Sequence, residues 1–317
     1  GPPRSIEDRL SFDLLQAHNL ASTGFLHRIA AGAAFFFAAF LFAAAPIVPS
    51  AWPPPLPLPS GVLVPRYAPG PHTGLGDTRA MTFRISWLGL PAGGATFELH
   101  HHALVPGLIV GEAHLYTNGL IDTFYTMRNY LREDFTRASL SPLDIYIVQR
   151  ENRRHDEFTV AFDRADRLVT SVKRSRKGVE RYRFRSDNPS GPFSGALMAL
   201  SQPLEIGKSY TFDIFTAINR YVIRFDVRRR DHIQTPLGDF DAILIAPYVV
   251  YWRDRWAPNT ARNVMLWVSA DNRHLPLRLE SATVFGSLRA DLVALGPGAV
   301  EWSALASPGT LKVCHNR

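Results

Sequence analysis

Hydrophobic and polar residues alternate through most of the chain after residue 80, which is the pattern of half-buried β-strands. The clearest example is the segment 221–228, in which every second residue is a large apolar one: Tyr221, Ile223, Phe225 and Val227. Between them lie Val222, Arg224, Asp226 and Arg228. We therefore expect the first set to face a core, and Arg224 and Arg228 to face solvent.

Similar segments recur with turn residues between them, among them 82–87, 95–102, 108–117, 144–149 and 287–295. About eleven short strands at even spacing are typical of an antiparallel barrel or a strongly curved sheet. The helical period appears only at 119–127, after the potential cap Asn118, and at 193–200. The predicted fold is mainly β, an antiparallel strongly curved sheet or unclosed β-barrel with two short plugging helices.

The N-terminal part of the chain has the pattern of an export signal. Leu26-His27-Arg28 precedes an uncharged apolar run, Ile29–Ala45. A basic flank, an apolar core and small residues behind it are typical of signal peptides, and the run is also just long enough to stay as a membrane anchor. We assign residues 26–50 to a signal peptide or N-terminal inner-membrane anchor, exclude 1–25 from the fold as a leader, and expect a periplasmic domain.

Proline dominates the next segment, with ten prolines from Pro46 to Pro71. Proline fixes φ and favours extended backbone, so residues 51–78 are predicted to be a semi-rigid tether. Residues 79–296 are long enough to form one β-barrel-like domain, and 297–317 are left as a C-terminal tail. The single cysteine, Cys314, allows no internal disulfide.

The formal net charge is +7, and arginine supplies nearly all of the cations, since only four of the 35 basic residues are lysine. For an exported protein, nucleic acid is excluded as a partner. Anionic lipid headgroups or glycans fit a basic surface better.

Candidate chemistry is sparse. His100 and His102 share a strand face and could be joined by His114 in a zinc site, although a surface histidine run is commoner. Ser194 lacks nucleophile-elbow spacing. The doublets Glu133-Asp134 and Asp156-Glu157 lie in predicted strands, where neighbours face opposite ways. We predict no catalytic residue, no metal and no cofactor.

Three segments, 230–242, 266–280 and 285–292, together resemble the domain-of-unknown-function 3108 family of exported bacterial proteins, as does the earlier 204–210. The resemblance covers about residues 80–295 and implies no catalytic residues, because that family has none established. The hairpin from Trp267 to Pro276 is also similar to one in bacterial lipoprotein carriers. That second resemblance implies an unclosed β-barrel in which short helices plug an apolar cavity.

The resulting hypothesis is a non-enzymatic envelope protein that binds a lipid or acyl chain in its curved sheet. Candidate ligand-binding residues are Phe124, Phe193, Leu197, Tyr248, Trp252 and Trp267. The aromatic and arginine-rich segment 248–256 could instead contact a glycan or an envelope protein.

Two alternatives stay open, a glycan-active or ester-hydrolysing enzyme and a structural interaction module with a filled core. A hollow of roughly several hundred Å³ would favour the carrier. Converging carboxylates would favour the enzyme, and a packed interior would favour the interaction module.

Overall fold

The computed structural model describes residues 52–70, 80–252, 264–283 and 286–296. The predicted leader, signal or anchor, and tail lie outside these ranges. The first eight strands are β1 Ala80–Trp87, β2 Leu90–His101, β3 Leu108–Thr117, β4 Met127–Thr136, β5 Pro142–Glu151, β6 Arg154–Asp163, β7 Leu168–Ser175 and β8 Gly178–Arg185. They are followed by β9 Pro189–Ser190, β10 Ser209–Thr216, β11 Asn219–Thr235, β12 Gly238–Trp252, β13 Val264–Ser269, β14 Pro276–Thr283 and β15 Gly286–Leu295. The helices are α4 Gly119–Asp122 and α5 Pro192–Ser201.

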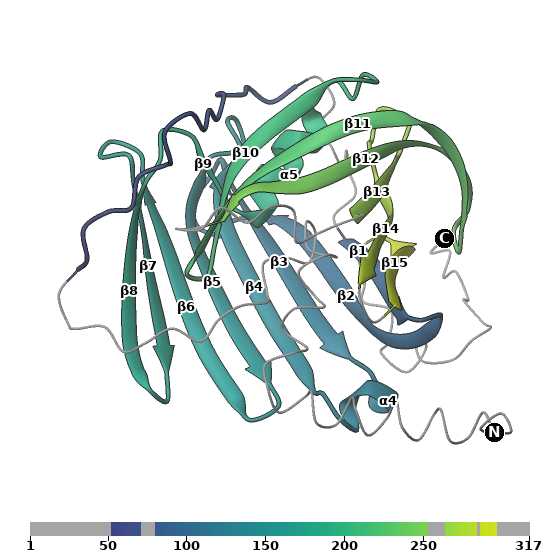
Figure 1. Ribbon diagram of the computed structural model, residues 1–317, viewed down its shortest axis with the longest axis horizontal. Coiled ribbons are helices and arrows are strands. Elements are labelled where there is room, and N and C mark those ends of the chain that lie inside the picture. The colour runs from purple at the N-terminus through teal and green to yellow at the C-terminus, as the bar shows by residue number, and fades with distance from the viewer. Residues whose placement is uncertain (1–51, 71–79, 253–263, 284–285, 297–317) are drawn as a thin grey trace, which may run out of the picture.

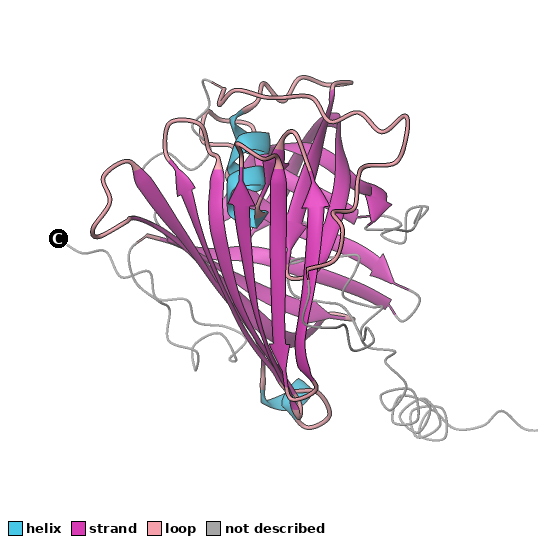
Figure 2. Ribbon diagram, turned by 90° about the vertical axis from the view of Figure 1, so that its left-hand side faces the viewer, coloured by secondary structure: helices cyan, strands magenta, loops and turns pink. Residues whose placement is uncertain are grey.

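These strands form one 15-stranded sheet in the order β8-β7-β6-β5-β4-β3-β2-β1-β15-β14-β13-β12-β11-β10-β9. Neighbours are antiparallel, except that the two-residue β9 runs parallel to β10. The two edge strands, β8 and β9, do not pair, so the sheet is not closed. Figures 1 and 2 show it bent into a half-barrel, with β10–β12 curving back over the first half of the sheet. The predicted fold class is confirmed.

The alternation in β11 has the predicted consequence. Tyr221, Ile223, Phe225 and Val227 are all buried, while Arg224 and Arg228 are exposed. Val222 on the opposite face is buried as well. The period-two pattern thus fixes the register of β11, because a slip of one residue would turn the apolar set outward.

The two predicted helices differ in role. Asn118 caps α4 as expected, with the Ile121 amide donating to Asn118 Oδ1 at 3.3 Å. However, α4 ends at Asp122, buries none of its residues and only connects β3 to β4 at the end of the sheet (Figure 1). It therefore does not plug the half-barrel. In contrast, α5 buries seven of its ten residues and lies inside the curved sheet (Figure 2).

The two ends of the sheet meet through side chains. Phe215 of β10 packs against Phe184 of β8 and Phe162 of β6, with ring centroids 5.4 Å and 6.2 Å apart. Ser171 of β7 donates a hydrogen bond to the carbonyl oxygen of Ala217, in the turn after β10. The β10–β11 hairpin end therefore rests on the inner face of β6–β8 and forms a seam between the two halves.

A fully buried ion pair lies in this seam. Arg220 and Asp213 are both 0% exposed, and the guanidinium donates to both carboxylate oxygens, at 2.8 Å and 2.6 Å. Ser186, directly after β8, donates to Asp213 Oδ2 at 2.5 Å. Arg220 Nη1 also donates to the carbonyl oxygen of Leu56 at 3.4 Å. Buried charges need such partners, because removing them from water costs several kcal/mol for each ion.

Residues 52–70, here called the strap, belong to the predicted tether, yet they lie against the domain (Figure 1). Leu56 pairs with the edge strand β8: its amide donates to Arg183 O at 2.8 Å and its carbonyl accepts from the Arg185 amide at 3.0 Å. Farther along, Val64 O accepts from Asn188 Nδ2, and Tyr67 OH accepts from the amide of Thr211 in β10. The strap turns at Ser60 and Gly61, where the Val62 amide donates to Pro59 O at 3.2 Å, and it bridges the gap between the two edges of the sheet.

We expect Phe225→Ala to lower the free energy of unfolding by about 3–5 kcal/mol, because it removes a buried aromatic ring from the core. Arg230→Ala on the same strand should change it by less than about 0.5 kcal/mol, because that side chain is exposed. Urea melts of the two variants measure both values. Equal losses would contradict the assigned faces of β11.

We expect Arg220→Leu to cost about 3–5 kcal/mol, because it leaves Asp213 buried without its counter-ion. Arg228→Leu is the matched control: Arg228 also pairs with an aspartate, Asp226, at 2.8 Å, but its side chain is 55% exposed. The control should lose less than about 1 kcal/mol. Similar melts for both variants would show that the seam does not depend on the buried pair.

Candidate functional site

The N-terminus of α5 is docked on β4 through a buried carboxylate. Glu133 is 0% exposed, and its two oxygens accept from the amides of Phe193 at 2.6 Å and Ser194 at 3.1 Å. These amides have no intrahelical partner, and a negative charge is favourable at a helix N-terminus. Gly191 allows the approach, since a Cβ there would lie 2.3 Å from the carboxylate.

Burial raises the pKa of Glu133 to about 7, while the hydrogen bonds from Ser194 and Phe193 act in the opposite sense. The carboxyl group therefore changes charge near neutral pH. Its ionisation is opposed by the surrounding apolar core and supported by the helix end.

The C-terminus of α5 is also held by polar contacts. Ser201 Oγ accepts from the amide of Gly70, and Gln202 Nε2 donates to Ala68 O at 2.9 Å, both in the strap. His274 Nδ1 lies 2.6 Å from the carbonyl oxygen of Leu200 and donates to it. Thus β4 holds one end of the helix, and the strap and the β13–β14 turn hold the other.

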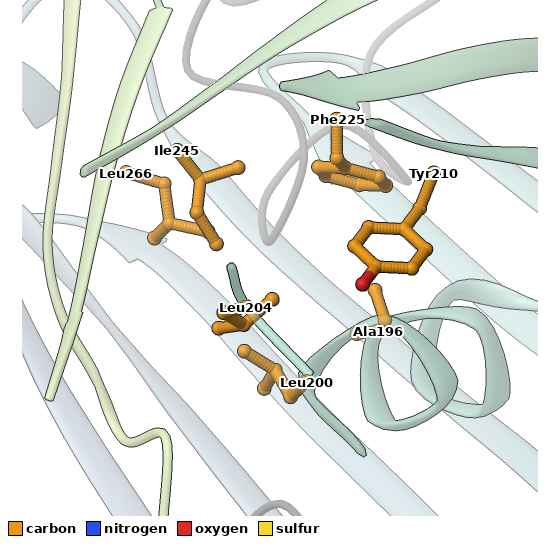
Figure 3. Close-up of a pocket in the computed structure, with 8 residues that line it drawn as sticks. Ala196, Leu200, Leu204, Tyr210, Phe225, Ile245 and Leu266 are labelled. Atoms are coloured by element: carbon orange, nitrogen blue, oxygen red, sulfur yellow. The ribbon is translucent and has the colours of Figure 1, made fainter. Parts of the chain in front are cut away.

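Between its ends, α5 contributes to a small apolar cavity (Figure 3). The lining residues come from α5 and the segment after it, and from β10–β13: Ala196, Ala199, Leu200, Leu204, Tyr210, Phe225, Ile245 and Leu266. In Figure 3, Leu200 and Leu204 face Ile245 and Leu266 across the space. The volume is about 10 Å³, room for about one water molecule. As described, this cavity is far smaller than the hollow expected of a loaded carrier.

Two of the predicted ligand-binding residues lie in α5, but neither lines this cavity. Phe193 is half-buried, and its ring packs edge-on against Phe97, with centroids 6.1 Å apart. It also covers Gly111 of β3, where a Cβ would lie 2.5 Å from Phe193 Cγ. Leu197 is buried in the core, 9% exposed.

The other predicted residues lie elsewhere. Tyr248 packs under the guanidinium of Arg224, 4.1 Å from the ring centroid. Trp267 is buried and donates from Nε1 to Asp231 at 3.0 Å. Phe124 is 48% exposed and follows α4, and Figure 1 shows α4 at the opposite end of the strands from α5. The side chain of Trp252 lies outside the described residues, and the five that are described do not gather at one site.

Sequence reasoning missed the residues that position α5. Glu133 had a readable sign, because the alternation of Leu131, Glu133 and Phe135 places a carboxylate on an inward face. The lining residues Leu204 and Tyr210 gave no such sign. They come from loop and strand segments whose position depends on the curvature of the sheet.

The serine and the histidines that were weighed for catalysis or zinc binding have structural partners. Ser194 is fully buried, and its Oγ accepts from the amide of Gly191 at 2.9 Å. His100 lies 3.9 Å from Glu112, and His102 lies 3.7 Å from Asp134. In the described part of the chain, no three His, Cys, Asp or Glu residues are grouped to hold a metal.

A row of buried charges crosses the inner face of β6–β8. Lys173 contacts Glu180 at 2.9 Å and Asp156 at 3.7 Å, and Tyr182 donates to Glu180 at 2.8 Å. Arg154 also pairs with Asp156. These carboxylates are neutralised by cations beside them, so the row resembles a satisfied structural network more than a pair of catalytic acids.

Comparison with known proteins places the chain in a family. The family described as "Protein of unknown function (DUF3108)" matches residues 82–293. The chain belongs to this family. The predicted resemblance is confirmed, and membership in the DUF3108 family brings no established activity. No curated protein matches the chain.

Three solved structures show some similarity to this chain. A β-barrel-like DUF1849 protein from Brucella abortus is 10% identical, with 71% of this chain and 98% of that chain covered and a TM-score of 0.48. A candidate exported protein with a YmcC-like fold from Bacteroides fragilis is 8% identical, with 74% and 98% covered and a TM-score of 0.31. A candidate lipoprotein from Parabacteroides distasonis is 8% identical, with 71% and 98% covered and a TM-score of 0.27. The terms exported protein and lipoprotein describe those two proteins.

Within the described ranges of this DUF3108 chain, no helix is long and apolar enough to cross a membrane. The apolar run 29–45 lies outside those ranges.

We expect Glu133→Gln to change how stability depends on pH. The pKa of Glu133 is raised above its unfolded value, so its contribution to stability is present at low pH and is lost as pH rises from about 4.5 to about 7. Relative to Glu133→Gln, the wild type should lose on the order of 2–3 kcal/mol between pH 5 and pH 8. Denaturant melts at several pH values measure this difference.

Glu157→Gln is the control, because its side chain is 42% exposed. Its stability difference from the wild type should vary little with pH. The same pH dependence in both variants would contradict the role of Glu133.

Proposed function

We propose that this chain is a non-enzymatic envelope protein whose curved sheet accepts an acyl chain or similar apolar ligand in the space now occupied by α5. The observation that carries the proposal is the way α5 is held. Its two ends make polar contacts, to Glu133 at one end and to the strap and His274 at the other. Its middle part faces an apolar cavity.

Such a helix can leave as a unit. The contacts at its ends are a few hydrogen bonds, each worth about 0.5–1.5 kcal/mol net. Seven of its ten residues are also buried, so an entering acyl chain would have to replace the apolar contacts that α5 gives up. The space vacated by α5 would join the existing cavity and would be lined by apolar side chains such as Phe225, Ile245 and Leu266.

The envelope location rests on the sequence run 29–45 and its basic flank. In the cell envelope the domain would have access to lipids, which could supply an acyl ligand. Whether the run is cleaved does not alter the proposal for α5.

The size of the cavity sets a condition on this function. At about 10 Å³ it holds no acyl chain, so uptake requires α5 to move. If α5 does not move, the filled interior favours the alternative of a structural interaction module. A disulfide that locks α5 distinguishes the two.

We expect the pair Gly111→Cys and Phe193→Cys, made with Cys314→Ser, to form such a lock. A Cβ at position 111 would lie 2.5 Å from Phe193 Cγ, which is close enough for a disulfide with slight adjustment. The affinity of the full chain for a fluorescent fatty acid, measured by titration, should be at least tenfold weaker in the oxidised protein than after reduction. The reduced protein is its own control, and Phe193→Cys alone controls for the lost ring.

Native mass spectrometry of the purified wild type provides a second measurement, because co-purified lipid would be seen directly. Equal probe binding in the oxidised and reduced states would show that α5 does not gate the site. Absence of saturable binding together with absence of co-purified lipid would reject the carrier and leave the interaction module.

A further inference from the structure

The outward face of the edge strand β8 carries a row of arginines. Arg181, Arg183 and Arg185 occupy alternate positions, while Tyr182 and Phe184 between them point to the interior. Since alternate residues of a strand share a face, the three guanidinium groups project from the same side of the sheet. More cations lie in β7 and the β7–β8 turn, so the basic face of β8 comprises Arg174, Arg176, Lys177, Arg181, Arg183 and Arg185.

Acidic residues do not neutralise this face. Among the described residues, no carboxylate forms an ion pair with Arg181, Arg183 or Arg185. Glu157 lies opposite Arg174 in the register but is within 3.6 Å of His155. Asp187 pairs with Arg167, at 2.9 Å.

Several arginines on the other half of the sheet are paired with carboxylates. Arg228 pairs with Asp226 at 2.8 Å, Arg229 with Asp231 at 3.2 Å, and Arg289 with Asp291 at 2.7 Å. At the β7–β8 end, by contrast, three arginines without a carboxylate partner among the described residues share one face, so a partner for this face should be anionic.

The strap adds an aromatic group to the same edge. Trp52 is 45% exposed, and the guanidinium of Arg181 lies 5.8 Å from its ring centroid. Tryptophan is enriched at the boundary between membrane and water, and arginine near that boundary is attracted to anionic headgroups. Leu56 and Val179 on the same edge are also partly exposed, at 36% and 39%.

Chain length connects this edge to the apolar run. Trp52 stands seven positions after Ala45, the last residue of that run. Seven fully extended residues span at most about 25 Å. If the run lies in a bilayer, the edge strand β8 stays close to the membrane surface, because Leu56 of the strap is paired with β8.

We propose that the basic face of β8, together with Trp52, docks on an anionic phospholipid bilayer. Arginine binds phosphate groups with paired hydrogen bonds, and each cation near an anionic surface adds to the attraction. The indole of Trp52 would lie at headgroup depth. The proposal concerns the orientation of the domain on the membrane, and it stands whether or not an acyl chain binds under α5.

The test uses the full chain in vesicles. Val179→Cys, made with Cys314→Ser, carries a fluorophore on the basic face, and a nitroxide on some lipid headgroups acts as the quencher. In vesicles of equal parts phosphatidylglycerol and phosphatidylcholine, we expect strong quenching at position 179. Leu104→Cys, labelled in the β2–β3 turn at a residue 86% exposed, should be quenched little.

Three comparisons isolate the charge. Quenching at position 179 should fall to background in pure phosphatidylcholine vesicles, and also at about 1 M salt, where the Debye length shrinks to about 3 Å. The combined change Arg181→Gln, Arg183→Gln and Arg185→Gln should abolish it. The combined change Arg137→Gln, Arg153→Gln and Arg230→Gln removes the same charge from exposed sites elsewhere and should leave it intact.

Any of three results in vesicles would overturn the proposal: equal quenching at positions 179 and 104, equal quenching at position 179 with and without phosphatidylglycerol, or equal loss in both triple variants. The comparison of vesicle compositions needs no arginine variant, so it decides the matter even if one variant misfolds. Release of the docked face by a soluble anionic polysaccharide at low salt, with no recovery on added phosphatidylglycerol, would assign the face to a glycan instead.

Discussion

The buried ion pair between Arg220 and Asp213 is the constraint on which the seam of this half-barrel depends. Neither group can be left alone in the interior, because an unpaired buried charge costs several kcal/mol. The pair is satisfied only when β10, β11, the residue after β8 and the strap all arrive at the same place. This electrostatic requirement, together with the packing of Phe215 on Phe184, joins two sheet ends that no strand pairing connects.

The position of α5 follows from the seam. Ser186 contacts the ion pair, β9 pairs with β10 at once afterwards, and the chain then enters the helix at Pro192. Little freedom is left between these points. Glu133 of β4, in the other half of the sheet, then accepts a hydrogen bond from the N-terminus of the helix, so that α5 bridges the two halves of the sheet.

Much of the fold could be predicted from local pattern. The alternation in β11 and the apolar stretch of α5 express periods of two and of 3.6 residues, which any short window reveals. The candidate site was harder. Aromatic content cannot tell which rings face inward together, and the structure separates Phe124, Phe193 and Tyr248.

The strap was predicted to be an extended, semi-rigid tether, whereas the structure turns it at Ser60 and Gly61 and lays it against the domain. Its attachment was not foreseen, because it depends on main-chain and side-chain contacts between residues more than a hundred positions apart, such as Gly70 with Ser201. No local pattern encodes such a pairing.

The strap also bears on what counts as the folding unit of this family. The matched region, 82–293, begins after it. A protein trimmed to that region would lose the main-chain pairing of Leu56 with β8 and one acceptor of Arg220. It would then present an uncovered strand edge, the feature through which β-proteins associate edge to edge. Proline has no backbone N–H to donate, so a proline-rich segment can cover such an edge without offering a new one to a further strand. The strap is therefore suited to limiting self-association through β8.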